Sequence, residues 1–227
     1  MLTILKGKPA NTLVISDTHF PYHHKNTFDF LEETASRWKC SNIVSVGDMF
    51  DLHRTGRHLP EPDSMSIKDE ISKARIAVKT LSSIFPKVRI CYGNHDLRAF
   101  KSAKEKGISP EMLRTIGELY HCPDTWEFNY EYIIDGVKIF HGDGYSGLKG
   151  AMDAATKNRM SVAIGHLHSF GGVNYHHNGY NRIFGMNVGC LIDVKAPAFA
   201  YAQTSKDKPT IGCGVIVEGK EAYFIPL

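Results

Sequence analysis

Short apolar runs alternate with amphipathic helical patterns along most of the chain. Five runs have the length and composition of buried strands: TLVIS (12–16), NIVSV (42–46), VRICY (88–92), VKIF (137–140) and SVAIG (161–165). After the first run, apolar residues recur at helical spacing, at Phe28, Leu31, Ala35 and Trp38. This alternation predicts an α/β fold in which helices cover sheets.

Capping signals mark where two of the helices begin. Ser66 is followed three residues later by Asp69, as in a capping box, and the apolar face of this helix comprises Ile67, Ile71, Ala74, Val78 and Leu81. Ser109 and Pro110 predict another helix, with an N-cap and a proline in the first turn, that carries Leu113, Ile116 and Tyr120. A further helix is expected near residues 148–159.

Turn signals predict hairpins toward the end of the chain. Asp135-Gly136, Asn178-Gly179 and Glu218-Gly219 each separate two runs with strand character. The pattern therefore predicts alternating β/α units that lead into antiparallel strands, arranged as a layered α/β sandwich. No repeat or Pro/Gly/Ser-rich linker divides the sequence, so residues 1–227 are expected to form a single domain.

Composition narrows the class of protein. The 42% hydrophobic and 22% charged content is that of a soluble globular protein. A net charge of +3 suits a phosphate-bearing substrate but falls short of a dedicated nucleic-acid binder. No apolar run is long enough to cross a membrane, and the first residues lack a signal-peptide layout. Five cysteines without a CxxC pair favour a reducing cytoplasm over a disulfide framework.

Each of the five apolar runs ends in side chains that bind metals or move protons. These side chains are Asp17 and His19, Asp48 and Asp51, Asn94 with His95 and Asp96, His141, and His166 with His168. Ligands of open α/β sheets bind at the carboxyl ends of the strands, so the five strand ends are expected to meet at one edge. Residues two apart on an extended chain face the same side, so each D-x-H or H-x-H pair can converge on one cluster.

The combined donor set exceeds what one tetrahedral ion needs. A carboxylate shared between two ions would explain the excess. Mixed oxygen and nitrogen donors without thiolate suit Mn, Fe, Zn or Co, and Mn²⁺ is the first expectation. Any one of these short motifs arises often by chance, but five in this order predict a site for two divalent metal ions.

The ordered set D-x-H, G-D-x-x-D, G-N-H-D, H-G and G-H-x-H, over residues 17–168, resembles the calcineurin-like metallophosphoesterase superfamily. The resemblance implies a four-layer α/β/β/α sandwich. It also implies one metal held by Asp17, His19 and His168, a second held by Asn94, His141 and His166, and Asp48 as the bridge. His95 would be the general acid or transition-state stabiliser, with Asp96 orienting its ring and Asp51 supporting the ligands.

The chemistry implied by this resemblance is phosphoester hydrolysis by a hydroxide held between two metals. Protein phosphatases of the superfamily continue the second motif with Arg-Gly and end the third in Glu, whereas this chain has GDMFDLHRTGRH and GNHD. GDMFD is closer to phosphodiesterases and repair nucleases, and the compact length resembles small phosphoesterases of phages and bacteria. The first expectation is a phosphodiesterase acting on nucleotides or nucleic acid in the cytoplasm, or the host cytoplasm if phage-encoded.

Two alternatives remain open at this point. A phosphomonoesterase would use the same two metals, and a non-catalytic scaffold would use the fold as a binding surface. Arg54, Arg57 and Arg98 follow the ligand motifs and are candidates for binding the substrate phosphate in two-pronged fashion. Lysines 101, 104 and 106 are interpreted as a solvated helix face, and no role is assigned to His23, His24, His53, Asp143, His176 or His177.

Overall fold

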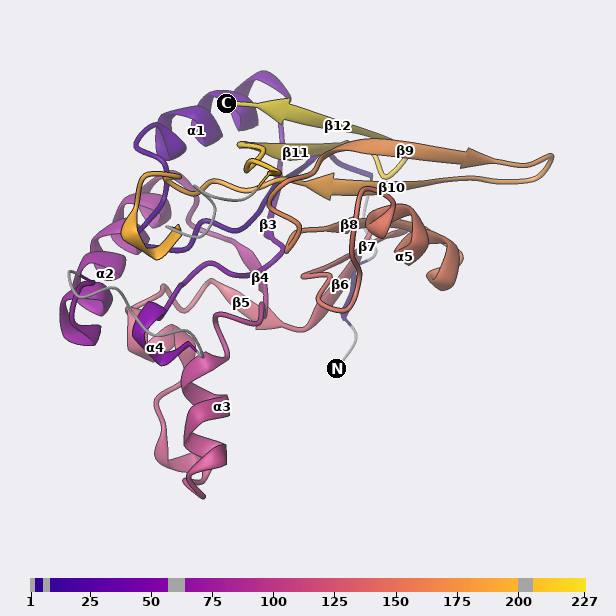
Figure 1. Ribbon diagram of the computed structural model, residues 1–227. Helices are drawn as coiled ribbons and strands as arrows, with labels where there is room; N and C mark the ends of the chain where they lie inside the picture. Colours follow the sequence, from indigo (N-terminus) through magenta and orange to yellow (C-terminus); the bar gives the residue numbers. More distant parts are fainter. Residues whose placement is uncertain (1–2, 6–8, 57–63, 200–205) are drawn as a thin grey trace.

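The structure is a computed structural model that describes residues 3–5, 9–56, 64–199 and 206–227. Two sheets of six strands face each other, with α1 and α2 on one side of the pair and α5 on the other (Figure 1). The predicted four-layer α/β/β/α sandwich is confirmed. The helices are α1 (Thr27–Arg37), α2 (Ile67–Ile84), α3 (Arg98–Glu105), α4 (Ile116–Tyr120) and α5 (Gly150–Asn158), with 3-10 turns at His53–Thr55, Pro110–Met112 and Pro197–Phe199.

The first sheet has the strand order β12-β11-β2-β3-β4-β5. Its four parallel members are β2 (Thr12–Ile15), β3 (Asn42–Ser45), β4 (Arg89–Cys91) and β5 (Glu127–Asn129). The hairpin of β11 (Gly212–Val217) and β12 (Glu221–Pro226) adds to β2 in antiparallel fashion. This hairpin turns at the predicted Glu218-Gly219 position.

The second sheet has the order β1-β6-β7-β8-β10-β9. Its strands are β1 (Thr3–Leu5), β6 (Glu131–Ile134), β7 (Val137–Phe140), β8 (Ser161–Ile164), β9 (Gly171–His177) and β10 (Arg182–Val188). Strands β6 and β7 pair around Asp135-Gly136, and β9 and β10 pair around Asn178-Gly179, so both predicted hairpins are confirmed. Strand β8 pairs in parallel with β7 and with β10.

Alternating side chains along β2 explain why the layers stack as they do. Leu13 and Ile15 lie in the core that includes Leu31 of α1 and Val78 of α2. Val14, between them, belongs to the core that joins the two sheets. A sheet with both faces apolar must be covered on both sides, by helices on one and by the second sheet on the other.

The helix boundaries agree with the capping signals at one site and differ at another. Ser66 caps α2, and its side chain accepts a hydrogen bond from the Asp69 backbone N–H. The single helix predicted from Ser109 is wrong, because the chain forms a 3-10 turn, an extended Leu113, and then the short helix α4. Thr115 and Glu118 form a complete capping box, which starts a new helix after Leu113.

Among the described residues, no helix has both the length and the apolar character needed to cross a membrane.

Candidate metal centre

Strand ends from both sheets build the site. Asp17 and His19 follow β2, Asp48 follows β3, Asn94 follows β4, and His141 and His166 follow β7 and β8 of the other sheet. The loops are fixed to one another through backbone hydrogen bonds, from Asp17 N–H to the Gly47 carbonyl and from His19 N–H to the Asp48 carbonyl. The predicted meeting of the five strand ends is therefore present.

Four of these residues adopt left-handed backbone angles. The φ values are 44° at Asp17, 46° at His19, 47° at Asp48 and 65° at His166. Such angles are costly for residues with a side chain, and they persist only where the surrounding structure imposes them. Their concentration at the ligand loops indicates a functional site rather than ordinary turns.

One group of donors consists of Asp17, His19 and His168. His168 Nε2 lies 3.1 Å from Asp17 Oδ1 and 3.2 Å from His19 Nε2. Asp17 and His19 are fully buried, and His168 is partly open to solvent. These are the three residues that the family resemblance implies for the first metal.

A second group consists of Asp48, His141 and His166. His141 Nε2 lies 3.2 Å from Asp48 Oδ2, 3.2 Å from His166 Nδ1 and 2.9 Å from Asn94 Oδ1. Asp48 also forms a group with His19 and His95, so it stands between the two sets of donors. The structure thus brings all seven predicted ligands together, with Asp48 in the shared position.

The donor atoms fit divalent cations. His19 uses Nδ1 for Asp51, at 2.8 Å, and His141 places Nδ1 3.2 Å from the Val46 carbonyl. With Nδ1 occupied in this way, the Nε2 lone pair of each ring faces the cluster, which is the usual arrangement for a metal-binding histidine. Imidazole, carboxylate and amide donors without thiolate agree with Mn, Fe, Zn or Co.

The buried carboxylates concentrate negative charge in the centre, which favours protons or cations beside them. Burial would raise the pKa of Asp17, yet hydrogen bonds from His168 and His19 hold that pKa well below its ordinary value. Burial would lower the pKa of His19, but its bonds to Asp17 and Asp51 raise it to about 10. The pKa of His141 rises to about 9 through the charge of Asp48, against the effect of burial. Without metal, protons on the histidines balance the charge of these carboxylates. Metal ions would replace those protons, so metal binding is expected to release protons.

Asp51, rather than Asp96, contacts the ring of His95. His95 Nδ1 lies 2.6 Å from Asp51 Oδ1, the same oxygen that contacts His19. The two oxygens of Asp96 accept hydrogen bonds from the backbone N–H groups of Phe50, at 2.9 Å, and Gly93, at 2.8 Å. The expectation that Asp96 orients His95 is thereby corrected: its carboxylate holds the two ligand loops together.

The three candidate arginines differ in what they contact. Arg98 Nη2 lies 2.8 Å from His95 Nε2, at the centre of the site. Arg54 donates to the carbonyls of Ser64 and Met65, both at 2.7 Å, so its guanidinium holds a loop. Arg57 and the neighbouring His58 lie outside the described residues.

Two further residues near the centre were not expected from the sequence. His53 places Nδ1 3.6 Å from Asp51 Oδ2, and its backbone N–H donates to Glu70 Oε1 at 3.0 Å. Glu70 is only 1% exposed, and burial raises its pKa to about 7. Helical spacing gave a signal for Glu70, because it shares a face with Ala74, Val78 and Leu81.

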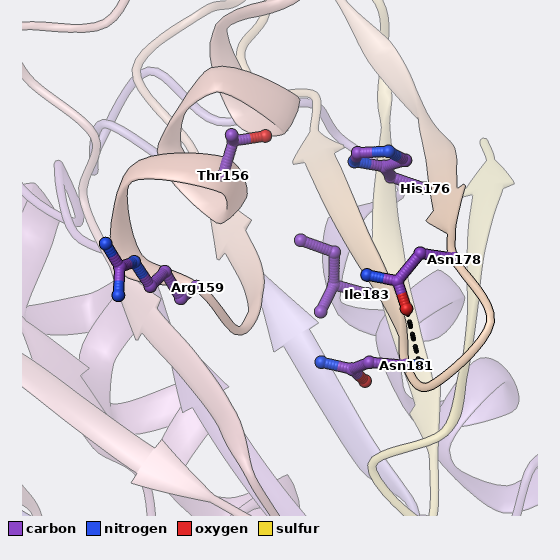
Figure 2. A pocket seen from close by; sticks show the side chains of 6 residues that line it. All are labelled: Thr156, Arg159, His176, Asn178, Asn181 and Ile183. Atoms are coloured by element: carbon purple, nitrogen blue, oxygen red, sulfur yellow. Dashed lines mark hydrogen bonds between the residues drawn. The ribbon is translucent and has the colours of Figure 1, made fainter.

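A separate pocket of about 280 Å³ lies between α5 and the β9–β10 hairpin (Figure 2). Asn178 accepts a hydrogen bond from the Asn181 backbone within it. Its lining residues are Thr156, Arg159, His176, Asn178, Asn181 and Ile183. None of these is a predicted ligand, and the side chains of His176 and His177 are exposed.

The family model described as calcineurin-like phosphoesterase matches residues 10–185. Among solved structures, a metallophosphoesterase from Sphaerobacter thermophilus is similar, with a TM-score of 0.48, 15% identity, and coverage of 96% of this chain and 88% of that one. Vacuolar protein sorting 29 from Cryptosporidium parvum has a TM-score of 0.47, 12% identity, and coverage of 96% and 97%. Yfce, a phosphoesterase from E. coli, has a TM-score of 0.44, 14% identity, and coverage of 90% and 87%. No curated protein matches the sequence.

Proposed function

This chain belongs to the calcineurin-like phosphoesterase family, and from that premise we propose that it is a metal-dependent phosphodiesterase acting on nucleotides or nucleic acid. The observation that carries the proposal is the position of Asp48 between the two donor groups, next to His95. One carboxylate shared by two sets of ligands is the arrangement needed to hold two divalent ions side by side.

We assign one ion to Asp17, His19 and His168, and the other to Asn94, His141 and His166, with Asp48 common to both. We expect both ions to be Mn²⁺. They would lower the pKa of a bound water molecule, so that hydroxide is available to attack phosphorus, and they would neutralise the charge on the phosphoryl oxygens.

His95 has the position of a residue that acts on the leaving group. Its backbone N–H donates to Asp48 Oδ1 at 2.7 Å, which places the ring beside the shared carboxylate. Asp51 contacts Nδ1 of the ring, and Nε2 lies 3.9 Å from Asp48 Oδ2 and 2.8 Å from Arg98 Nη2. We propose that Nε2 gives a proton to the leaving oxygen when the phosphoester bond breaks.

The charge distribution supports a phosphodiester polymer as substrate. Residues 98–114 carry five Lys or Arg and two Glu, and this net charge of +3 equals that of the whole chain. The segment begins three residues after His95 and extends away from the sheets with α3 (Figure 1). The side chains of Lys101, Lys104 and Lys106 are exposed and can contact the phosphates of a nucleic acid. Such contacts make the binding affinity fall as the salt concentration rises.

The five cysteines are free, which supports a reducing cytoplasm as the proposed location.

The test uses purified protein treated with a chelator and reconstituted with Mn²⁺. A chromogenic nitrophenyl diester and its monoester measure the preferred ester, and a dinucleotide measures cleavage of an alkoxide leaving group. The proposal predicts faster diester cleavage that returns only with metal. On the dinucleotide, His95→Ala should reduce turnover on the order of 10²- to 10⁴-fold, the usual contribution of a general acid, while retaining both ions.

Other outcomes have definite meanings. Faster monoester cleavage would replace the proposal with a phosphomonoesterase. Two bound ions without hydrolysis of any of these esters would overturn catalysis and favour a non-catalytic scaffold.

A further inference from the structure

We propose that an aromatic row at the ends of β4 and β5, together with the exposed lysines of α3, binds single-stranded nucleic acid beside the metal centre. The inference rests on the proposed function and deepens it, because it names an unpaired strand as the substrate class. It assigns Tyr130 the binding of a base, which the metal centre, as a site for phosphate, does not include.

The aromatic row consists of Phe128, Tyr92 and Tyr130. The ring centroids of Tyr92 and Phe128 are 5.9 Å apart in a stacked arrangement, and those of Tyr92 and Tyr130 are 5.1 Å apart. The backbone fixes this row, because the Tyr92 N–H donates to the Asn129 carbonyl at 2.9 Å, just beyond the parallel pairing of β4 with β5. Phe128 packs against the core at one end of the row, and Tyr130 is exposed at the other.

The exposure of Tyr130 leaves a ring available to a ligand. The residue is 61% exposed, although aromatic side chains usually bury most of their surface. Every nucleobase has a flat face that stacks on such a ring, whatever the base sequence. Bases in a duplex are already stacked on their neighbours, so an exposed tyrosine favours an unpaired strand.

The row begins beside the metal centre. Tyr92 immediately precedes Gly93, where an added Cβ would lie 2.1 Å from Asp48 Oδ1. The next residue, Asn94, belongs to the second group of donors, with Oδ1 2.9 Å from His141 Nε2. A strand with one phosphate at the metals therefore brings its neighbouring nucleotides toward the aromatic row.

Helix α3 supplies the cations that a nucleic-acid strand needs. Arg98, its first residue, donates to the Asp51 carbonyl at 3.0 Å, so the helix starts at the centre and extends away from the sheets (Figure 1). Lys101 and Lys104 follow at three-residue spacing, which makes them neighbours along one side of the helix. Both lysines are exposed.

The lysines and the aromatic row lie on the same face of the first sheet. Phe100 of α3 and Tyr92 pack against the same core, the one that α1 and α2 cover. Cations that follow the phosphates, combined with rings on which bases stack, are the means by which proteins bind single strands. Charge and aromatic surface therefore both indicate single-stranded nucleic acid as the occupant.

The test measures the fluorescence anisotropy of a labelled oligothymidylate of about 10 nucleotides, within the usual footprint of single-strand-binding folds. All variants are made in Mn²⁺-loaded His95→Ala protein, so that cleavage during the titration is slow. Tyr130→Ala should weaken binding at least about fivefold, as expected for the loss of one stacked base. Tyr130→Phe keeps the ring and should retain the affinity. Tyr180→Ala is the matched control, because Tyr180 is fully exposed in the turn between β9 and β10.

Lysine variants separate the phosphate contacts from base stacking. The double change Lys101→Gln and Lys104→Gln should reduce the slope of log affinity against log salt by about 1.4, since each contact with a single strand contributes about 0.7. Tyr130→Ala should leave this slope unchanged, because stacking releases no counterions. The matched control is Lys73→Gln with Lys79→Gln, two exposed lysines of α2, which should keep the wild-type slope.

A duplex of the same length distinguishes base stacking from a general loss of binding. Tyr130→Ala should leave the affinity for the duplex unchanged. The proposal is overturned by an equal loss for single strand and duplex, by no loss for either, or by a salt slope that the two α3 lysines do not change. Wild-type protein that hydrolyses no phosphoester would instead contradict the proposed function, and the anisotropy result would still decide whether Tyr130 binds a base.

Discussion

Asp51 and Asp96 both belong to loops of the centre, and their hydrogen bonds give them different tasks. Asp96 is adjacent to His95 in sequence, but its oxygens accept from the Phe50 and Gly93 backbone. Asp51 comes from a distant loop and contacts His95 through Oδ1. The sequence revealed which residues gather at the site, but not the directions of consecutive side chains in a tight turn, because these depend on backbone angles set by tertiary contacts.

Asparagine substitutions distinguish the two aspartates. Asp51→Asn should reduce turnover on the order of 10- to 100-fold, since it removes the charge that orients the ligand His19 and the acid His95. Asp96→Asn should mainly destabilise the fold, by about 1–3 kcal/mol, because an amide N–H would face a backbone donor. Steady-state kinetics and chemical denaturation of both variants measure the two effects. The assignment fails if Asp96→Asn loses turnover at unchanged stability and Asp51→Asn retains it.

At the scale of elements, glycines at the strand ends allow the ligand loops to approach one another. A Cβ added at Gly93, after β4, would lie 2.1 Å from Asp48 Oδ1 and 2.3 Å from its backbone nitrogen. One added at Gly165, after β8, would lie 2.4 Å from Asp17 Oδ2. The glycines that precede Asn94 and His166 therefore have a physical cause, which is close packing of one ligand loop on the next.

Gly93→Ala should displace Asp48 and weaken metal binding at least about tenfold, as expected when a ligand is misplaced. Gly179→Ala is the matched control, because a Cβ there meets no atom within 4 Å. Calorimetric titration with Mn²⁺ measures both variants. Unchanged Mn²⁺ affinity in Gly93→Ala would show that the close approach to Asp48 is not required.

Strand elements were predicted more fully than helices, for a local reason. The five apolar runs and their terminal ligands carry their own pattern, and each became a strand or strand end. The helix expected from Ser109 failed because Leu113 is extended, and the Thr115–Glu118 capping box starts a new helix between Leu113 and Ile116. In this segment the capping signal and the apolar periodicity predict different helix starts. Periodicity alone cannot show which start the chain adopts.

At the scale of the whole molecule, the four layers bring ligands from two sheets to one place. The family resemblance predicted that architecture, whereas hydrophobic periodicity alone predicted only alternating layers. The order of strands and the pairing of β1 with β6 join distant segments, so no local pattern specifies them.

Stability should depend on pH through Glu70, which is buried beneath the loop that carries Asp51. Its Oε2 has no hydrogen-bond partner among the described residues, and burial raises its pKa from 4.5 to about 7. The folded state therefore binds a proton more tightly than the unfolded state, and this group's stabilising effect is lost as pH rises from about 4.5 through about 7.

Glu70→Gln should remove this dependence. At pH 8 the variant should be more stable than the wild type by up to about 2–3 kcal/mol, and near pH 4.5 the two should be similar. Urea denaturation at both pH values measures the difference, with the exposed Glu33→Gln as control. A difference in unfolding free energy that does not change with pH would contradict the account of Glu70.

The most direct measurement for the whole account is the number of divalent ions held by the folded protein. Native mass spectrometry of Mn²⁺-reconstituted wild type should count two ions. Asp48→Ala removes the carboxylate that both donor groups share, so it should lose both ions at the concentrations that saturate the wild type, and Gly179→Ala should keep them. A wild type that never holds more than one ion, or an Asp48→Ala variant that still holds two, would contradict the shared-carboxylate centre.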